Sequence, residues 1–164
     1  MQDVTKQIVD FLTSVGIRVH EGSVATDSFL PGLSIVNGSL VYDRLSLQWP
    51  GDLLHEAGHI ATVPTSIRAL LSDSLDHAPL VPHSGEAEAT AWAYAATVHL
   101  GLDPSVLFHH GGYHGKSSSL ITAYSCGVYL GSYGLTLAGM TLVGIDATSA
   151  STLPYPHMSQ WLRD

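Results

Sequence analysis

A five-residue run, HEAGH, occupies positions 55–59 and lies between helix-breaking residues. Pro-Gly at 50–51 precedes the run and Pro64 follows it, so the spacing predicts one short helix from Leu53 to about Val63. Asp52 is the expected N-cap, because a short carboxylate can accept a hydrogen bond from the free amides of the first turn. The two histidines of the run are four residues apart, and such residues share one face of a helix.

This pattern is typical of a metal site. His55 and His59 can bring both imidazoles to a single tetrahedral ion. Glu56 lies one residue further round the turn, which makes it a poor third ligand but places its carboxylate near the open coordination position, where a general base is needed. The chain has 10 histidines and 4 glutamates, so chance would produce the bare pattern only about 0.015 times.

A third protein ligand is needed, because catalytic zinc is held by three protein groups and keeps one exchangeable position. Two of the four glutamates open a second predicted helix, Glu86 to about Leu100, between Gly85 and Gly101. The face of Glu86 carries alanines, whose small side chains would let this helix approach the first one closely. We therefore expect Glu86 to be the third ligand.

Other third ligands stay open at this point. Glu88 is the main alternative, although it lies on a different face of the helix from Glu86 and also suits a solvated carboxylate or a group that orients a ligand histidine. A histidine outside the two helices, such as His77, His83 or one in the loop after Pro104, is a further choice.

The two motifs together resemble a known family. HEAGH is followed, after 26 intervening residues, by EAEATAWA at positions 86–93. This pairing is similar to that of the ImmA/IrrE-type zinc metallopeptidases, a gluzincin group whose signature is HExxH followed by E-x-E-A-N-x-F-A. The resemblance covers roughly residues 30–100, with Thr90 and Trp92 where the family has asparagine and phenylalanine, and without the Leu-Leu-x-Pro that follows in the family.

The resemblance implies a fold and a set of roles. It implies a zincin-like fold in which His55, His59 and Glu86 bind one Zn²⁺ ion and Glu56 is the general base. It does not extend to a helix-turn-helix segment, which accompanies some members and is not visible here.

The whole sequence predicts an α+β fold that is mostly helical, with a small antiparallel β-hairpin before the HEAGH helix. Apolar residues at helical spacing predict an amphipathic helix over residues 3–15. The β-prone runs LSIV and SLVY, between Leu33 and Tyr42, flank Asn37-Gly38, a strong hairpin signal. Residues 64–85 suit a surface connection with a short helix near Ser66 to Leu71.

An uncharged stretch extends from Ser117 to Ile145 and is long enough to span a bilayer. Glycines and polar residues interrupt it and no basic cluster flanks it, so we favour two closely packed buried helices. Its large side chains are expected in the core: Tyr124, Tyr129, Tyr133 and Met140. The tail, Leu153 to Asp164, is expected to be irregular and to wrap the surface.

Composition narrows the class of protein further. With 164 residues, we expect one zincin-like domain over 1–164. The net charge of −8 argues against nucleic acid as a direct partner. Cys126 is the single cysteine and no signal peptide is visible, so a cytoplasmic location is expected.

The predicted function is that of a zinc-dependent metallopeptidase, which hydrolyses a peptide bond through a zinc-activated water with Glu56 as general base. The partner would be a peptide or protein substrate, aligned along the strand Ser39 to Tyr42. A second donor to the developing oxyanion would come from the glycine-rich loop after Leu107, which offers His109, His110, Tyr113 and His114.

Two other hypotheses are kept. The first is a non-catalytic structural or regulatory zinc-binding module, in which a protein group such as a histidine from 109–114 fills the open position. The second is a membrane-associated peptidase that uses Ser117 to Ile145 as a span. The sequence does not decide between zinc, manganese and iron as the ion used in the cell.

Overall fold

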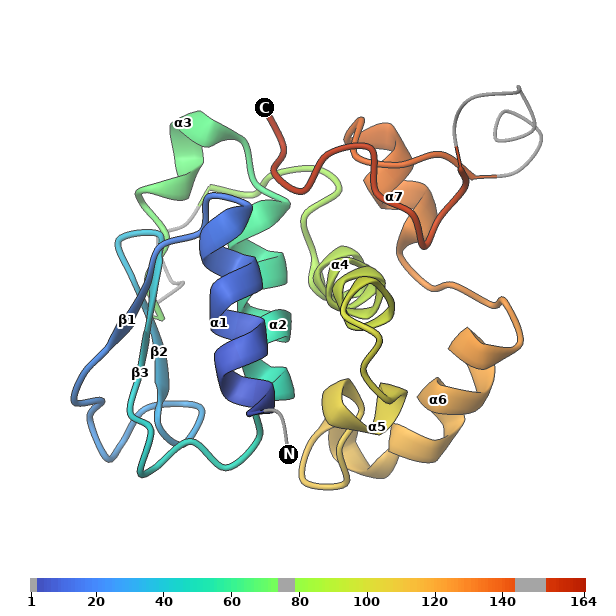
Figure 1. Ribbon diagram of the computed structural model, residues 1–164. Coiled ribbons are helices and arrows are strands. Elements are labelled where there is room, and N and C mark those ends of the chain that lie inside the picture. Colours follow the sequence, from blue (N-terminus) through green and yellow to red (C-terminus); the bar gives the residue numbers. More distant parts are fainter. Residues whose placement is uncertain (1–2, 74–78, 144–152) are drawn as a thin grey trace.

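The computed structural model describes residues 3–73, 79–143 and 153–164. It has an α+β architecture, as predicted, with helices packed beside a small mixed sheet (Figure 1). In chain order the elements are α1 (Val4–Ser14), β1 (Val19–Glu21), β2 (Leu33–Val36), β3 (Ser39–Tyr42), α2 (Gly51–Ala61), α3 (Thr65–Arg68), α4 (Glu86–His99), α5 (Pro104–Leu107), the 3₁₀ turn η2 (Tyr113–Gly115), α6 (Ser117–Ser125) and α7 (Ser132–Leu137).

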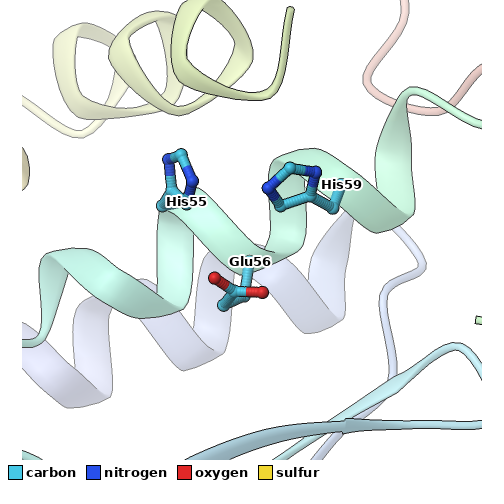
Figure 2. Close-up of side chains that lie close together, drawn as sticks. All are labelled: His55, Glu56 and His59. Atoms are coloured by element: carbon cyan, nitrogen blue, oxygen red, sulfur yellow. The ribbon is translucent and has the colours of Figure 1, made fainter. Parts of the chain in front are cut away.

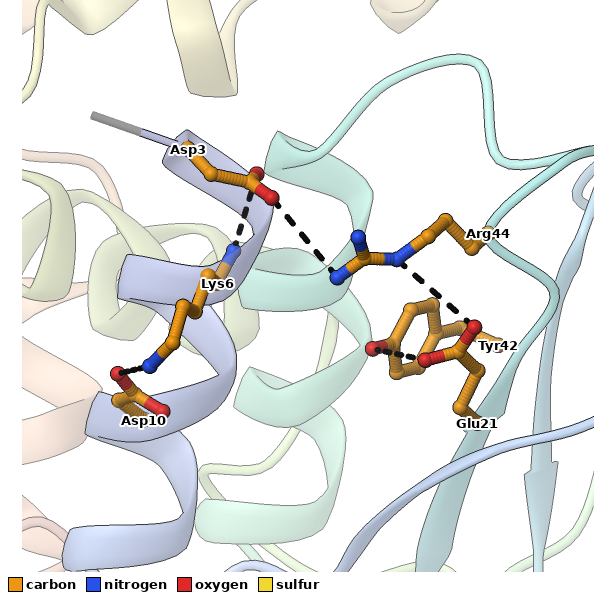
Figure 3. Close-up of polar contacts among 6 residues, drawn as sticks. All are labelled: Asp3, Lys6, Asp10, Glu21, Tyr42 and Arg44. Carbon is orange, nitrogen blue, oxygen red and sulfur yellow. Dashed lines mark hydrogen bonds and ion pairs between the residues drawn. The ribbon is translucent and has the colours of Figure 1, made fainter. Parts of the chain in front are cut away.

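Helix α1 confirms the amphipathic helix predicted over 3–15. The Asp3 carboxylate caps its first turn by accepting a hydrogen bond from the Lys6 amide at 3.3 Å. Beside the same end of the helix, Arg44 lies 3.8 Å from Asp3 and 3.8 Å from Glu21 of β1, so one guanidinium links the helix to the sheet (Figure 3). These groups are exposed, and such pairs add little stability. The apolar face of α1 contributes more to stability, since Ile8, Phe11 and Leu12 are buried.

The predicted hairpin is present as β2 and β3. These strands pair antiparallel through a two-residue turn, in which Asn37 and Gly38 have φ of 49° and 71°. Positive φ at both turn positions matches the right-handed twist of the flanking strands.

One sheet prediction is wrong. The strand Ser39 to Tyr42, β3, is predicted to align the substrate, which requires an open edge, but the strand order is β1-β3-β2, so β3 is the central strand. Strand β1 pairs parallel to it on the other side. With three residues, β1 is too short to show a periodic sequence signal.

Helix α2 lies between the sheet and α4 (Figure 1). Its side chains toward the core are fully buried, among them Leu53, Leu54 and Ile60. The helix begins at Gly51 with Pro50 as N-cap, and proline suits this place because the first amides of a helix have no partner within it. Asp52 is therefore inside the first turn, and the prediction that it caps the helix is wrong.

Helices α2 and α4 cross at very short range. A Cβ atom on Gly58 would overlap the backbone of Ala89, so only glycine fits at this point of α2. The alanines along the same side of α4, including Ala93 and Ala96, are fully buried. The close approach predicted from the alanine-rich face is confirmed.

The uncharged stretch after Ser117 is less buried than predicted. It forms α6, in which Tyr124 alone is buried, and the short α7. Tyr124 and Met140 lie in the core as expected, whereas Tyr133 is 66% exposed because α7 presents that side to solvent. Residues 144–145 lie outside the described part of the chain. No described helix has the length and apolar character needed to cross a bilayer.

The tail wraps the surface, as expected. Over 153–164 it forms no helix or strand. The Trp161 ring packs edge-on against Phe11 of α1 and Trp92 of α4, with ring centres 5.0 and 5.5 Å apart. The Arg163 amide donates to the carbonyl of Ala61 at 3.0 Å, so the tail covers the end of α2.

Candidate metal centre

Helix α2 carries the two motif histidines on one face. Figure 2 shows both imidazoles on the same side of α2, with the His59 ring turned toward His55. Their ring centres are 5.0 Å apart. Candidate ligand atoms of His55, Glu56 and His59 all lie within 4.8 Å of one another. Among the described residues, this is the group of His, Cys, Asp and Glu side chains that could hold a metal ion.

Glu86 meets both imidazoles from the first turn of α4. Its Oε2 lies 3.2 Å from Nε2 of His55, and its Oε1 lies 3.1 Å from Nε2 of His59. Zinc ligands lie about 2.0–2.1 Å from the ion, so two ligand atoms at the corners of a tetrahedron are about 3.3 Å apart. Each imidazole nitrogen thus lies from one oxygen of Glu86 at about the distance that separates neighbouring ligand atoms around such an ion.

The charges of this cluster favour an ionised carboxylate. Hydrogen bonds from His55 and His59 hold the pKa of Glu86 well below its ordinary value. Burial alone would lower the pKa of His59, but the hydrogen bond to Glu86 and the charge of Glu56 raise it above the usual 6.5. A divalent cation between these groups would replace the proton that the imidazole otherwise shares with the carboxylate.

Glu56 projects from a different side of α2 (Figure 2). It borders a small cavity shared with Leu33 and Ser34 of β2, and it also lines the larger cleft described below. Burial raises the pKa of its carboxyl group, while the nearby His59 and His55 oppose that rise. A carboxylate with a raised pKa is a better proton acceptor near neutral pH than an exposed one.

The alternative ligands are placed elsewhere. Glu88 uses its carboxylate to accept a hydrogen bond from the Gly85 amide at 3.0 Å, which caps α4, and its side chain packs against Gly134 of α7. His83 is not part of the candidate metal group. His77 lies outside the described residues.

A cleft of about 810 Å³ opens in front of the cluster. One wall carries His55, Glu56 and Glu86, and the opposite wall is the loop around Tyr113, which continues into α6. The α6 side adds apolar side chains from Leu120, Tyr124 and Leu130. The cleft is large enough for several residues of a peptide.

The loop of residues 109–114 separates the four side chains that the sequence offered as oxyanion donors. His109 is buried and its Nε2 lies 2.8 Å from Oδ1 of Asp52. His110 is exposed and lies edge-on to Trp49, and His114 is exposed. Tyr113 lies beside His55, with ring centres 6.0 Å apart and the rings nearly perpendicular.

Sequence reasoning missed the contact between Asp52 and His109. The sequence predicts a helix cap at Asp52, and no spacing rule connects this residue with a histidine 57 residues later. Trp49, which stacks on His109 with ring centres 4.6 Å apart, was likewise not singled out. Only the tertiary structure brings these residues together.

Comparison with known protein families, with curated proteins and with solved structures returned no match. The structure therefore defines an α+β protein with an HExxH-like candidate metal group, His55, Glu56 and His59, on helix α2. The resemblance to the ImmA/IrrE-type peptidases rests on the two sequence motifs.

Proposed function

We propose that this protein is a zinc-dependent peptidase in which His55, His59 and Glu86 bind one zinc ion and Glu56 is the general base. The observation that carries the proposal is the position of Glu86, whose two carboxylate oxygens lie 3.2 and 3.1 Å from the Nε2 atoms of the two histidines. These three groups come from two helices, and two of them, His55 and Glu86, line an open cleft.

The donor set fits a catalytic zinc ion. Two imidazoles and one carboxylate are a usual ligand set for zinc hydrolases, and three protein ligands leave one position for an exchangeable group. When bound, zinc would lower the pKa of a water molecule and polarise the carbonyl group of the substrate. The two histidines are partly buried and α4 holds Glu86 close to both of them, so the ligands are preorganised for such an ion.

Glu56 has the properties of the base. Its raised pKa, caused chiefly by burial, brings its proton affinity closer to neutral pH. It can therefore accept a proton as the water attacks and pass it to the departing amine of the peptide. Its position off the ligand face of α2 keeps its carboxylate available for this transfer.

The substrate would lie in the cleft between α2 and the loop around Tyr113. A substrate strand cannot pair with the outer edge of β2 in this structure, because Asp73 already occupies that edge. The Ile35 amide donates to the Asp73 carboxylate at 2.6 Å, and the Asp73 amide donates to the Ile35 carbonyl at 3.1 Å. A peptide that paired with β2 would first have to displace Asp73.

One observation favours a second candidate function. The carboxylate of Glu56 also lies within 4.8 Å of both histidine ligand atoms. If Glu56 rather than Glu86 bound the ion, no base would remain in this group, and the protein would be a structural or regulatory zinc-binding module. The first function is favoured because the Glu86 oxygens are closer to both imidazoles.

Metal analysis combined with a peptide library tests the proposal. Zinc content is measured in the purified wild type and in Glu56→Gln, His59→Ala and Glu86→Ala, and cleavage of the library is followed by mass spectrometry. We expect one zinc per chain in the wild type and in Glu56→Gln, loss of zinc in the other two variants, and cleavage by the wild type alone. Full cleavage by Glu56→Gln, or zinc loss in that variant, contradicts the proposal.

A further inference from the structure

The loop opposite the candidate metal centre is held by a stack of two side chains, of which His109 is buried and Trp49 partly buried. Trp49 lies parallel to the His109 ring at 4.6 Å, with 7° between the ring planes. His109 in turn contacts Asp52 on the first turn of α2 at 2.8 Å, and both side chains are largely buried, at 5% and 13% exposure. This stack joins the start of the loop to the same helix that carries His55.

The loop then closes around the stack at very short range. A Cβ atom on Gly111 would lie 2.6 Å from Nε1 of Trp49, and one on Gly112 would lie 2.9 Å from the His109 ring. The next two residues, Tyr113 and His114, have φ of 57° and 51°. Residues other than glycine rarely adopt this left-handed backbone conformation. Such strained residues persist where the surrounding structure imposes the conformation on them.

This strained conformation places the Tyr113 hydroxyl in an unusual position. The hydroxyl oxygen is buried and has no hydrogen-bond partner among the described residues. The ring lines the cleft and meets His55 edge-on. An unpaired buried hydroxyl disfavours the folded state, so a group kept in this way suits a partner that arrives with a ligand.

We propose that Tyr113 donates a hydrogen bond to the carbonyl oxygen of the scissile peptide bond as negative charge develops on it, and that Asp52, His109 and Trp49 are positioning residues for this donor. The inference rests on the proposed peptidase function. Tyr113 is assigned a catalytic role because it would touch the substrate, whereas the other three act through it.

The chemistry of the loop supports a neutral phenol as the donor. Burial, followed by the negative charge of Asp52, raises the pKa of Tyr113 above its ordinary value of 10, so the hydroxyl keeps its proton throughout the neutral range. A fixed donor of this kind is worth most where charge appears in the transition state. His110 and His114, by contrast, are exposed to solvent, where a hydrogen bond to developing charge is worth less.

The first test compares Tyr113→Phe with Tyr133→Phe, which removes the same hydroxyl from an exposed tyrosine of α7. On a peptide cleaved by the wild type, we expect Tyr113→Phe to lower kcat about 100-fold with little change in KM. Its thermal midpoint should be unchanged or higher, because the variant removes an unpaired polar group. Unchanged kcat in Tyr113→Phe would overturn the donor role.

The second test addresses the positioning residues through a double-mutant cycle. Asp52→Ala alone should lower kcat, and Asp52→Asn should restore most of it because the amide oxygen can still accept from His109. In the Tyr113→Phe background, Asp52→Ala should cause no further loss of kcat. Independent, multiplicative losses would show that Asp52 does not act through Tyr113 and would overturn this part of the proposal.

A binding measurement separates this inference from the peptidase function. The probe is N-phosphorylated leucyl-alanine, whose tetrahedral, negatively charged phosphoryl group resembles the attacked carbonyl group in the transition state. It is titrated into zinc-loaded protein, and binding is measured by calorimetry. We expect about tenfold weaker binding by Tyr113→Phe than by the wild type. Equal affinities, or no binding by the wild type, would overturn the inference. Cleavage that survives Glu56→Gln would instead refute the proposed peptidase mechanism, in which Glu56 is the general base.

Discussion

Gly58 of α2 and Ala89 of α4 mark the point at which the two helices of the candidate metal centre touch. A Cβ atom on Gly58 would collide with the backbone of Ala89, and one residue later His59 meets Glu86 from the same pair of helices. The spacing of the candidate ligands is therefore set by backbone contact, which side-chain rotation cannot adjust.

Replacing Gly58 tests this dependence. Gly58→Ala is expected to lower the free energy of unfolding by about 1–3 kcal/mol, because the added methyl group forces α2 and α4 apart. Zinc affinity should fall at the same time. Urea denaturation and a zinc titration measure the two effects, with Gly22→Ala as the control because its Cβ would meet Val41 at an ordinary 3.5 Å. Zinc affinity equal to that of the wild type would show that the helix spacing does not set the site.

The two glutamates of α4 give a matched pair of variants. Glu86→Gln replaces a carboxylate beside both imidazoles and should reduce zinc affinity at least about tenfold. Glu88→Gln should leave it unchanged, because the glutamine can still accept the hydrogen bond from the Gly85 amide. Competition with a chelator of known zinc affinity measures both variants. The reverse order of affinities would identify Glu88 as the ligand.

The metal-free protein should lose stability as the pH rises above neutrality. Folding raises the pKa of His59 above 6.5, so its contribution is complete below that pH and disappears as the pH rises through the folded value. The raised pKa of Glu56 acts in the same direction above 4.5. Thermal midpoints between pH 6 and 9 measure the slope, which His59→Ala should flatten.

At acid pH the sign is opposite. Folding lowers the pKa of Glu86, so its contribution is present above the ordinary value of 4.5 and is lost only as the pH falls through the depressed value. Because glutamine does not titrate, Glu86→Gln should lose less stability than the wild type when the pH is lowered. A variant with the same acid limb as the wild type would contradict the pairing of Glu86 with the histidines.

The outer edge of β2 offers a further prediction. The Asp73 carboxylate accepts hydrogen bonds from the Ile35 amide and the Ser34 hydroxyl, so Asp73→Ala should free the Ile35 amide at that edge. Amide hydrogen exchange at Ile35 is expected to become roughly tenfold faster. The control is Asp103→Ala, which also removes an exposed carboxylate that accepts a hydrogen bond from a backbone amide, in this case at the start of α5. Unchanged exchange at Ile35 would mean that Asp73 does not close the edge.

Sequence reasoning succeeded where the structure follows local rules. The breakers around HEAGH placed α2, and the Asn37-Gly38 turn placed the hairpin. The alanine face of α4 predicted the close approach to α2, which brings Glu86 beside the histidines, and the role of Glu86 as a metal ligand stays a prediction. In each case the residue spacing within one element was enough.

The failures share a different cause. Strand β1 and the central place of β3 depend on pairing between distant segments, which periodicity does not report. Asp52 was assigned to a local cap, although His109 competes for its carboxylate from far along the chain. The position of Tyr113 depends on backbone strain in the loop after Phe108, and four neighbouring candidates could not be separated without it.

The most direct measurement is zinc K-edge X-ray absorption on the purified, zinc-loaded protein. Binding by His55, His59 and Glu86 predicts four nitrogen and oxygen neighbours at about 2.0–2.1 Å, with the outer-shell scattering of two imidazoles. Loss of one carboxylate neighbour in Glu86→Gln would accompany it. A sulfur neighbour at about 2.3 Å, or a spectrum that is identical in Glu86→Gln, would contradict this ligand set.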